Sequence, residues 1–319
     1  MSGFSPEMLQ GLAQTALVVA AGWFFAASGW VGPEARQPLM RLVIWLFFPA
    51  LIFDRVHANP LLSEGSRAAL YLGAGYVMIA GGIAVGALVR RLIGLPADVR
   101  GRSFAYAAGI NNFGYLGIPV AAALFDRDVV GVLLVHNVGV EAAIWTVGVA
   151  YLTGQSGWRV ARNLVHPMTM ALAVALAVNL LGWSDLTLVR VAGRVTHDVG
   201  ACAIPVGLLL TGIYLHETLR GFDPLADRRV SAGFLLVRLA LMPVLVLLAA
   251  GLLVQDPSLR KVMLVQAAMP AGMFTFLIVG HCKGDVGVAL RGTLVTSAAC
   301  LVTMPLWIEA GRRWLGFAG

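Results

Sequence analysis

The stretch GINNFGYLGIP, residues 109–119, is the part of the sequence that indicates the fold most clearly. It places two asparagines, three glycines and a proline inside a long apolar run. A continuous helix in a bilayer disfavours such a cluster, because glycine permits non-helical backbone angles and proline lacks the N–H that a helix needs. The stretch therefore predicts a helix that is broken at this point.

Composition places the break in a membrane protein. Of 319 residues, 59% are hydrophobic and 12% are charged, whereas a soluble domain carries about 25% charged residues. Uncharged runs recur along the chain, and each is long enough to cross a hydrocarbon core of about 30 Å as a helix. These runs cover residues 8–31, 68–89, 103–125, 163–183 and 262–280. The chain is expected to be an all-α polytopic membrane protein.

The apolar pattern predicts ten membrane spans with short connections between them and no separate soluble domain. The spans are expected at residues 8–31, 38–57, 67–89, 102–125, 128–153, 163–183, 193–215, 231–254, 260–281 and 286–309. An even number of spans places both termini on the same side of the membrane.

Charge distribution predicts the orientation. The net charge is +7, but the arginines lie between apolar runs, so we expect loop charges and no nucleic-acid partner. The connection that holds Arg90, Arg91, Arg100 and Arg102 is the most basic. The positive-inside rule then favours periplasmic termini in a bacterial-type inner membrane. No basic residue precedes the first run, which we therefore expect to be a retained span.

Two pairs of short patterns predict an internal repeat. FFPALIF around Pro49 resembles CAIPVGLLLTG around Pro205, and Asp128 in DRDVVGVLL matches Asp285 in KGDVGVAL. The separations are 156 and 157 residues, close to half of the chain. Five spans per half is an odd number, so the two halves must have opposite topology. Inverted repeats of this kind are typical of secondary transporters.

The repeat gives the break in the first half, residues 1–155, a counterpart in the second half, residues 156–319. The counterpart is QAAMPAGMFTF, which contains Pro270 and Gly272. In inverted-repeat transporters, paired interrupted spans mark the binding site at mid-membrane. We therefore predict that spans 4 and 9 are broken and cross each other.

A broken turn frees backbone N–H and C=O groups, which must face protein or a watery cavity. The amides of Asn111 and Asn112 can satisfy some of them and also bind a ligand. Each new helix N-terminus carries a partial positive charge that suits a carboxylate. Two crossing breaks would thus form an anion site without a buried lysine or arginine. The alternative is a simple kink, with glycines that allow close helix packing.

The span at 128–153 contains Asn137, Glu141 and Trp145 on one helix face, at positions i, i+4 and i+8. An ionised carboxylate at a helix centre costs about 2.5–3.5 kcal/mol on insertion scales. A neutral Glu141 could donate a hydrogen bond to a substrate carboxylate, and its titration could couple protons to transport. The alternative is a structural carboxyl group that is satisfied within the helix bundle.

Other polar residues in the apolar runs have simpler interpretations. His136 points about 100° away from Asn137, which favours packing or an interfacial position. Arg238 is expected to extend towards the cytoplasmic interface. Asp54 and Arg55 are expected to form an interfacial pair.

Small residues in two spans are assigned mainly to helix packing, and the hydroxyl residues of the last span either line a path or mediate packing. These residues are Gly73, Gly75, Gly81, Gly82 and Gly86 in one span and Thr293, Thr296 and Ser297 in the other. The cysteines lack metal-ligand spacing, so neither a metal nor a cofactor is expected. H-E-x-x-H, G-x-S-x-G and P-loop motifs are absent, so an enzyme is not expected.

NNFGYLGIPVAAALF followed by an aspartate, MPAGMF in the second half and VEAAIW resemble the auxin efflux carrier family. That family includes bacterial malonate-type carriers and plant auxin transporters. The resemblance implies a ten-helix fold of two inverted repeats, related to the bile-acid sodium symporters. It also implies that helices 4 and 9 cross between a scaffold domain and a moving transport domain, and that a homodimer forms.

Residues 117–119 match the family's GIP motif, Asn112 matches its asparagine, and Pro270 matches the proline of the second crossing. Two positions differ from the plant members. Asn111 stands where they have proline, and Glu141 stands where they have glutamine. A titratable acid at that place makes proton coupling a reasonable hypothesis. The charged pair that the plant members carry in span 3 is missing, so a small mono- or dicarboxylate is expected and auxin is not.

The sequence therefore predicts a secondary transporter of small, malonate-like organic anions that works by elevator-type motion, with H⁺ as the candidate coupling ion. A Na⁺-coupled or uncoupled carrier and a membrane sensor or intramembrane enzyme are the alternatives. Glu141 is the candidate coupling residue. The candidate substrate-binding residues are Asn111, Asn112, Gly114, Tyr115, Asn137, Glu141, Pro270, Ala271, Gly272 and Thr275.

Overall fold

The computed structural model describes residues 6–63, 65–155, 167–219 and 226–317. Within these ranges the chain is helical, with a single isolated β-bridge. The all-helical membrane class that the composition predicts is confirmed. Residues 163–166 of the sixth expected span, and the boundary between the two expected repeats, lie outside the described residues.

The helices of the first half follow the expected spans closely. They are α1 (Pro6–Ala27), α2 (Arg36–Leu42), η2 (Val43–Phe47), α3 (Phe48–Val56), α4 (Ser66–Leu92), α5 (Val99–Gly109), α6 (Gly117–Leu124), α7 (Arg127–Ala143), η4 (Ile144–Gly148) and α8 (Val149–Thr153). The segments α2–η2–α3 and α7–η4–α8 each form one continuous helix.

The second half of the chain is likewise helical in its described residues. Its helices are α10 (Pro167–Leu180), α11 (Thr187–Ala201), α12 (Ala203–Leu219), α13 (Arg228–Leu236), η6 (Val237–Leu241), α14 (Met242–Leu253), α15 (Pro257–Ala268), α16 (Thr275–His281) and α17 (Val286–Leu315). The segments α13, η6 and α14 form one continuous helix.

Five of the described helices are long and apolar enough to cross a membrane. They are Ser66–Leu92, Asp128–Thr153, Thr187–Tyr214, Arg228–Leu253 and Val286–Leu315. Two shorter apolar helical stretches cover Leu17–Ala27 and Met170–Leu180. The two broken helices, α5–α6 and α15–α16, consist of segments that are individually too short to span a bilayer.

The segments η2, η4 and η6 are single wide turns of π-helix. Pro49 follows η2 after one residue, and Pro243 follows η6 at the same spacing. Such wide turns occur where a helix must adapt locally. At these two places the helix continues through a proline, which has no N–H to donate inside the helix.

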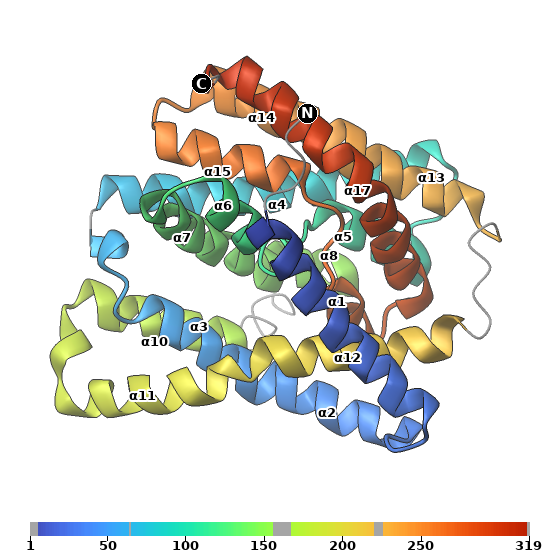
Figure 1. Ribbon diagram of the computed structural model, residues 1–319, viewed down its shortest axis with the longest axis horizontal. Coiled ribbons are helices and arrows are strands. Elements are labelled where there is room, and N and C mark those ends of the chain that lie inside the picture. The colour runs from blue at the N-terminus through green and yellow to red at the C-terminus, as the bar shows by residue number, and fades with distance from the viewer. Residues whose placement is uncertain (1–5, 64, 156–166, 220–225, 318–319) are drawn as a thin grey trace.

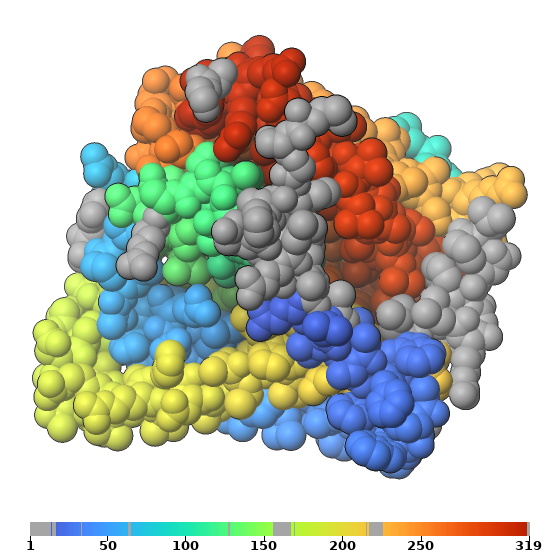
Figure 2. Space-filling view, in the orientation of Figure 1, coloured from blue at the N-terminus to red at the C-terminus, as the bar shows by residue number. Residues whose placement is uncertain are grey.

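The helices form two groups (Figure 1). In the lower group, α1 packs on α12, and α10 and α11 pack on α3. In the crossing group, α4 packs on α5 and α7, and α17 packs on α5, α13, α15 and α16. In Figure 2 the blue and yellow atoms of the lower group cover the lower part of the molecule, below the green and red atoms of the crossing group.

Glycines allow α4 to approach its neighbours in the crossing group. A side chain at Gly75 would meet the backbone of His136, and one at Gly82 would meet the backbone of Gly109. Gly86 likewise faces α5. A side chain at Gly73 or Gly81 would meet no other described residue within 4 Å, so the expectation that they serve packing is wrong for these two positions.

Aspartates begin five helices of the crossing group, including α13, which Asp227 begins. Asp98 begins α5, Asp126 begins α7, Asp256 begins α15 and Asp285 begins α17, and each carboxylate accepts a bond from a backbone N–H three residues later. Asp126 is therefore the residue of the first half that has the same capping role as Asp285. Asp128, which the sequence pattern matches with Asp285, lies inside the first turn of α7.

Substitution of Gly82 should therefore disturb the packing of α4 against the end of α5. Gly82→Ala is expected to destabilise the protein by about 1–3 kcal/mol, because the added methyl group meets backbone that cannot move freely. The matched control is Gly81→Ala, on the same helix but facing open space. Thermal unfolding of the purified protein in detergent measures both. Equal melting temperatures for the two variants would contradict the packing assignment.

Candidate functional site

The two helix breaks cross and bond to each other. The first runs between Gly109, the end of α5, and Gly117, the start of α6; the second separates α15 from α16. Asn111 and Ala271 form an antiparallel β-bridge. The Asn112 N–H donates to the carbonyl of Pro270 at 2.8 Å, and the Gly272 N–H donates to the carbonyl of Ile110 at 2.9 Å. Each break thereby satisfies groups that the other one frees.

Hydroxyl groups complete the support of the second break. Thr296 on α17 accepts a hydrogen bond from the Ala271 N–H at 3.1 Å. Thr275 and Thr293 donate to the carbonyl of Gly272 at 2.7 and 3.3 Å. Of the two roles open to Thr296, lining a path or mediating packing, its contacts match the second.

A buried amide network ties the crossing to α7. The Asn111 amide donates to both the backbone carbonyl and the side-chain oxygen of Gln266. The Gln266 amide in turn donates to Asn137 Oδ1 at 3.2 Å. Both Gln266 and Asn137 donate to the carbonyl of Phe113, at 3.4 and 3.3 Å. Gln266 was not among the predicted site residues, although it is a polar residue one helical turn before Pro270 in an apolar run.

Asn112 organises the start of α6. Its side-chain oxygen accepts a bond from the Leu116 N–H at 3.3 Å, and its backbone carbonyl accepts one from the Gly117 N–H at 3.1 Å. Asn112 thus shapes the turn with its side chain and joins the two breaks with its backbone.

Backbone N–H groups at the two breaks remain unpaired among the described residues, including five that precede α6 and α16. Those of Phe113, Gly114, Tyr115, Met273 and Phe274 donate to no group of the described residues. They precede α6 and α16, where helix dipoles concentrate partial positive charge. All five residues line one cavity. An unpaired N–H is costly in an apolar interior, so these donors suit an anionic or strongly polar ligand.

The cavity has a volume of about 120 Å³ and lies between the two groups of helices. The lower group contributes apolar side chains from α3 and its neighbours, including Phe48, Met168 and Ile204, together with Arg55. The crossing group contributes the breaks and the face of α7 that carries Asn137, Glu141 and Trp145. Most of the lining is apolar, with a few convergent polar groups, as is usual for small-molecule sites.

Arg55 and Glu141 both line this cavity, from opposite groups of helices. Glu141 is half-buried, and its carboxyl group makes no hydrogen bond to any described residue. Arg55 Nε lies 4.0 Å from Asp54 Oδ2, and Asp54 also lies 3.2 Å from His197 on α11. The expectation of a simple interfacial Asp54–Arg55 pair is therefore incomplete, because Arg55 also reaches the cavity. The sequence showed no signal for this, since Arg55 lies at a predicted span end.

An aromatic cluster closes one side of the cavity. The Tyr115 ring lies 4.7 Å from that of Phe274, which in turn lies 4.7 Å from Phe48 of α3. The Tyr115 hydroxyl is buried and has no partner among the described residues. Beyond Tyr115 a second cavity of about 260 Å³ lies between α1, α12 and α17, with Thr293 and Ser297 in its lining.

The structure brings together most of the predicted substrate-binding residues. Pro270 lines the second cavity, and Ala271 lines neither cavity. Those that line the first cavity are Asn111, Asn112, Gly114, Tyr115, Asn137, Glu141, Gly272 and Thr275. Both side-chain hydrogen bonds of Asn111 go to Gln266, so its role as a ligand contact stays a prediction.

Arg238 does not extend to the interface, and that prediction is wrong. Its side chain is only 1% exposed, and it donates to the carbonyls of Met269 and Gly109 at 3.4 and 3.3 Å. These carbonyls belong to the C-terminal ends of α15 and α5. A guanidinium therefore lies at the carbonyl ends of the two helices of the crossing, outside the lining of the cavity described above.

His136 lies away from the cavity, as its position on α7 predicts. It is fully buried, and neither ring nitrogen has a partner among the described residues. In the part of the chain that the structure describes, no cluster of three or more His, Cys, Asp or Glu residues could hold a metal ion.

Long apolar helices, together with two broken helices that meet at a cavity with unpaired donors, define the class of polytopic membrane transporters. Comparison with known proteins gives the family. A model of the membrane transport protein family matches residues 8–161 and 155–308. The chain belongs to this family, which is that of the auxin efflux carriers, and the resemblance seen in the sequence is confirmed.

A related sequence gives the same class. A protein of Methanothermobacter thermautotrophicus (strain Delta H), described as an uncharacterized transporter, is similar to this chain. The two are 25% identical over 300 residues, which cover 91% of this chain and 94% of the relative. The chain is thus an integral membrane protein of a transporter family, and the family points to transport rather than to catalysis.

Gln266 should be essential for the geometry of the crossing. Gln266→Leu leaves the amide of Asn111 and the oxygen of Asn137 without their buried partners, so we expect a loss of about 1–3 kcal/mol of stability. The control is Thr303→Val, because the buried hydroxyl of Thr303 has no partner to lose among the described residues. Thermal unfolding measures both variants. A Gln266→Leu variant as stable as the control would contradict the network.

Proposed function

We propose that this protein is a secondary transporter of small organic anions that works by elevator-type alternating access. The observation that carries the proposal is the set of unpaired N–H groups at the crossing, which converge on a cavity between the two helix groups. In this proposal the N–H groups of residues 113–115 and 273–274 bind the substrate carboxylate. Asn111 and Asn112 border that position.

The proposal includes ten spans in two inverted five-helix repeats, residues 1–155 and 156–319. The aspartates that begin helices support it. Asp98 and Asp256 begin the broken helices, and Asp126 and Asp285 begin the helices that follow them. Their order is the same in both halves, and their spacing is nearly the same, with 28 residues from Asp98 to Asp126 and 29 from Asp256 to Asp285. With ten spans, the loop charges favour periplasmic termini in an inner membrane.

In the elevator scheme the crossing group moves and the lower group stays fixed. The largely apolar contact between the two groups at the cavity supports this division, because apolar surfaces can slide without breaking specific bonds. The aromatic contact of Phe274 with Phe48 spans the two groups. It would open and close as the substrate enters and leaves.

Glu141 is the proposed coupling residue. Its carboxyl group lines the cavity and has no hydrogen-bond partner among the described residues. No hydrogen bond therefore holds it in either its protonated or its ionised form. A protonated Glu141 can donate to the substrate carboxylate. Intramembrane carboxylates of this kind mark proton relays in pumps and transporters.

Glu141→Gln tests the coupling role. The amide cannot titrate, so uptake by the variant should no longer rise as the external pH falls, whereas uptake by the unmodified protein should. The matched control is Glu309→Gln, because Glu309 is exposed and pairs with Arg313 near the end of α17. Initial uptake rates in proteoliposomes across a range of pH measure the effect. An unchanged pH profile for Glu141→Gln would exclude this residue as the coupling group.

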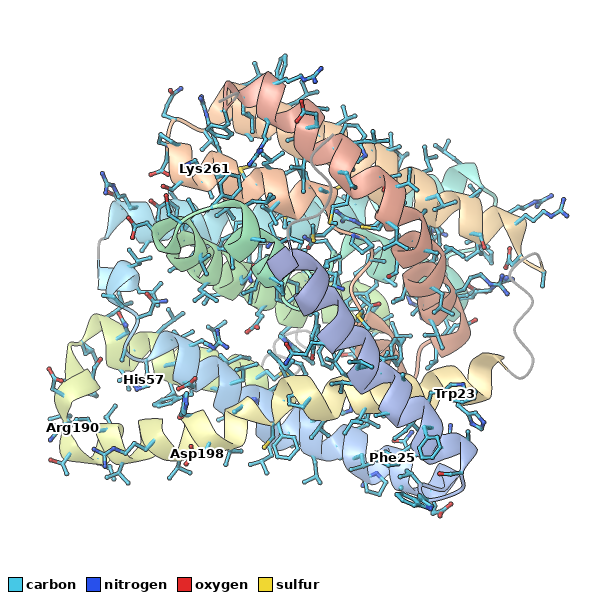
Figure 3. The ribbon with its side chains drawn as sticks, viewed as in Figure 1. Trp23, Phe25, His57, Arg190, Asp198 and Lys261 are labelled. Atoms are coloured by element: carbon cyan, nitrogen blue, oxygen red, sulfur yellow. The ribbon has the colours of Figure 1, made fainter. Side chains whose placement is uncertain are left out.

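Arg55 should contribute to anion affinity from the fixed side of the cavity. Hydrogen bonds to charged groups are worth about 1.5–3 kcal/mol, so Arg55→Gln should raise KM by about tenfold or more. The control is Arg190→Gln, because Arg190 lies in the first turn of α11 at the edge of the lower group (Figure 3). A KM equal to that of the control would remove Arg55 from the site.

The class of function has a direct test. Purified protein is screened for thermal stabilisation by pyruvate, lactate, malonate, succinate and phenylacetate, and the stabilising acids are then assayed for counterflow. Saturable counterflow is expected of a carrier, and binding without flux would indicate a sensor. Omission of Na⁺ distinguishes proton coupling from sodium coupling.

A further inference from the structure

Arg238 is a buried charge that the proposed function leaves unused. It lies in η6, near the middle of the continuous helix 228–253, and its Nη2 has no partner among the described residues. No carboxylate of the described residues forms an ion pair with it. Its two hydrogen bonds go only to the backbone carbonyls of Gly109 and Met269. The charge is therefore solvated by peptide groups but not neutralised.

Helix dipoles account for the position of this charge. The C-terminal end of each helix carries roughly half a negative elementary charge, and the N-terminal end the opposite. Arg238 contacts the C-terminal ends of α5 and α15, whereas the cavity lies at the N-terminal ends of α6 and α16. A cation and an anion are thus stabilised on opposite sides of the crossing. Dipoles add no net charge, so the total charge of this group depends on ionised side chains.

Arg238 and Glu141 both belong to the crossing group. The helix that carries Arg238 packs on α4, α5, α15 and α17, and α7, which carries Glu141, packs on α4 and α15. Every other Asp, Glu, Lys or Arg in the described helices of this group lies within two turns of a helix end. Those charges can remain at the membrane surfaces, but Arg238 and Glu141 cannot.

We propose that Arg238 is a fixed positive charge of the moving group, and that the substrate carboxylate and ionised Glu141 alternate as its counter-charge. This inference rests on the proposed transport function. With a monoanion bound and Glu141 protonated, the two central charges sum to zero. After the anion leaves and Glu141 loses its proton, they again sum to zero. One proton then moves with each monoanion, and transport carries no net charge.

The physical reason is the cost of moving unbalanced charge through a medium of low dielectric constant. An empty carrier with neutral Glu141 would carry the charge of Arg238 alone, and a loaded carrier with ionised Glu141 would carry one negative charge. Both movements are disfavoured relative to the neutral ones. Coupling thus follows from the charge balance of the crossing group and needs no direct contact between Arg238 and Glu141.

Other titratable groups near Glu141 do not alter this balance. Arg55 and Tyr115 line the same cavity, and the described parts of α10, α12 and α16 contribute no titratable side chain to it. Arg55 belongs to the fixed group. On the α4 side, Tyr76 bonds to Thr146 at 3.1 Å. His136 is buried without partners among the described residues, so its neutral form is the one that the site can hold.

The first experiment measures charge movement by the unmodified protein in proteoliposomes. The probes are radiolabelled pyruvate, phenylacetate and malonate, and the membrane potential is set with potassium and valinomycin. For pyruvate or phenylacetate, net uptake should follow the pH gradient and should not change with the potential. A dianion such as malonate should instead respond to the potential. Monoanion uptake that is driven by the potential would overturn the inference.

The second experiment separates exchange from net flux. Glu141→Gln should keep monoanion counterflow, since its loaded form is neutral, but should lose net uptake by about tenfold or more because its empty form is charged. Adding Arg238→Gln leaves the empty form neutral but gives the loaded form one negative charge, so monoanion counterflow should now fall by about tenfold or more. Adding Arg238→Lys instead keeps the positive charge and should keep the counterflow. This pair separates the charge of Arg238 from its packing role.

The outcomes distinguish the two proposals. Full net uptake by Glu141→Gln, or a folded double variant with Arg238→Gln that keeps full monoanion counterflow, would overturn the charge balance. Thermal unfolding shows whether the Arg238→Gln variant folds. If it does not fold, two measurements still test the charge balance: the response of uptake by the unmodified protein to the potential, and the ratio of counterflow to net uptake in Glu141→Gln. Absence of counterflow for every probe would instead contradict the transport function itself.

Discussion

The reciprocal backbone bonds between the two helix breaks are the constraint on which the rest of the structure depends. A break in a membrane helix is tolerable only if its freed peptide groups find partners inside the protein. Here the bonds from Asn112 to Pro270 and from Gly272 to Ile110 join two breaks that lie about half a chain apart. Neither break could persist alone. The bond pair therefore fixes which helices cross, and the cavity forms where the two N-terminal ends meet.

The crossing also separates regions of opposite partial charge. It gathers carbonyl ends on one side, where Arg238 binds them, and N–H ends on the other, where five donors have no partner among the described residues. The amide network of Asn111, Gln266 and Asn137 lies between and holds the crossing against α7. Because α7 also carries Glu141, the position of the titratable group is tied to that of the crossing. The same contacts thus determine both the geometry of the crossing and the position of its titratable group.

Sequence alone predicted the helices, the break at 109–119 and its partner at Pro270, because glycine, proline and asparagine clustered in an apolar run disfavour a continuous helix. It failed where a residue's role depends on a distant neighbour. Arg238 was expected at the interface because its partners, two peptide carbonyls, leave no mark in the sequence. Arg55 was assigned to the surface because its distance from the cavity depends on how the two groups pack. Gln266 was missed because amides are common and its importance comes from what it bonds.

A site built from backbone groups has a consequence for specificity. Peptide N–H groups bind any carboxylate of suitable size and cannot distinguish one acid from another by their chemistry. Discrimination must come from the side chains that enclose the rest of the substrate, and in this cavity many of these belong to α3, α10 and α12. Those helices are not held by the bonds of the crossing, so their lining residues can change without disturbing it. Under the proposed function, the fold thus separates the part that would recognise a carboxylate from the wall that would select which carboxylate is carried.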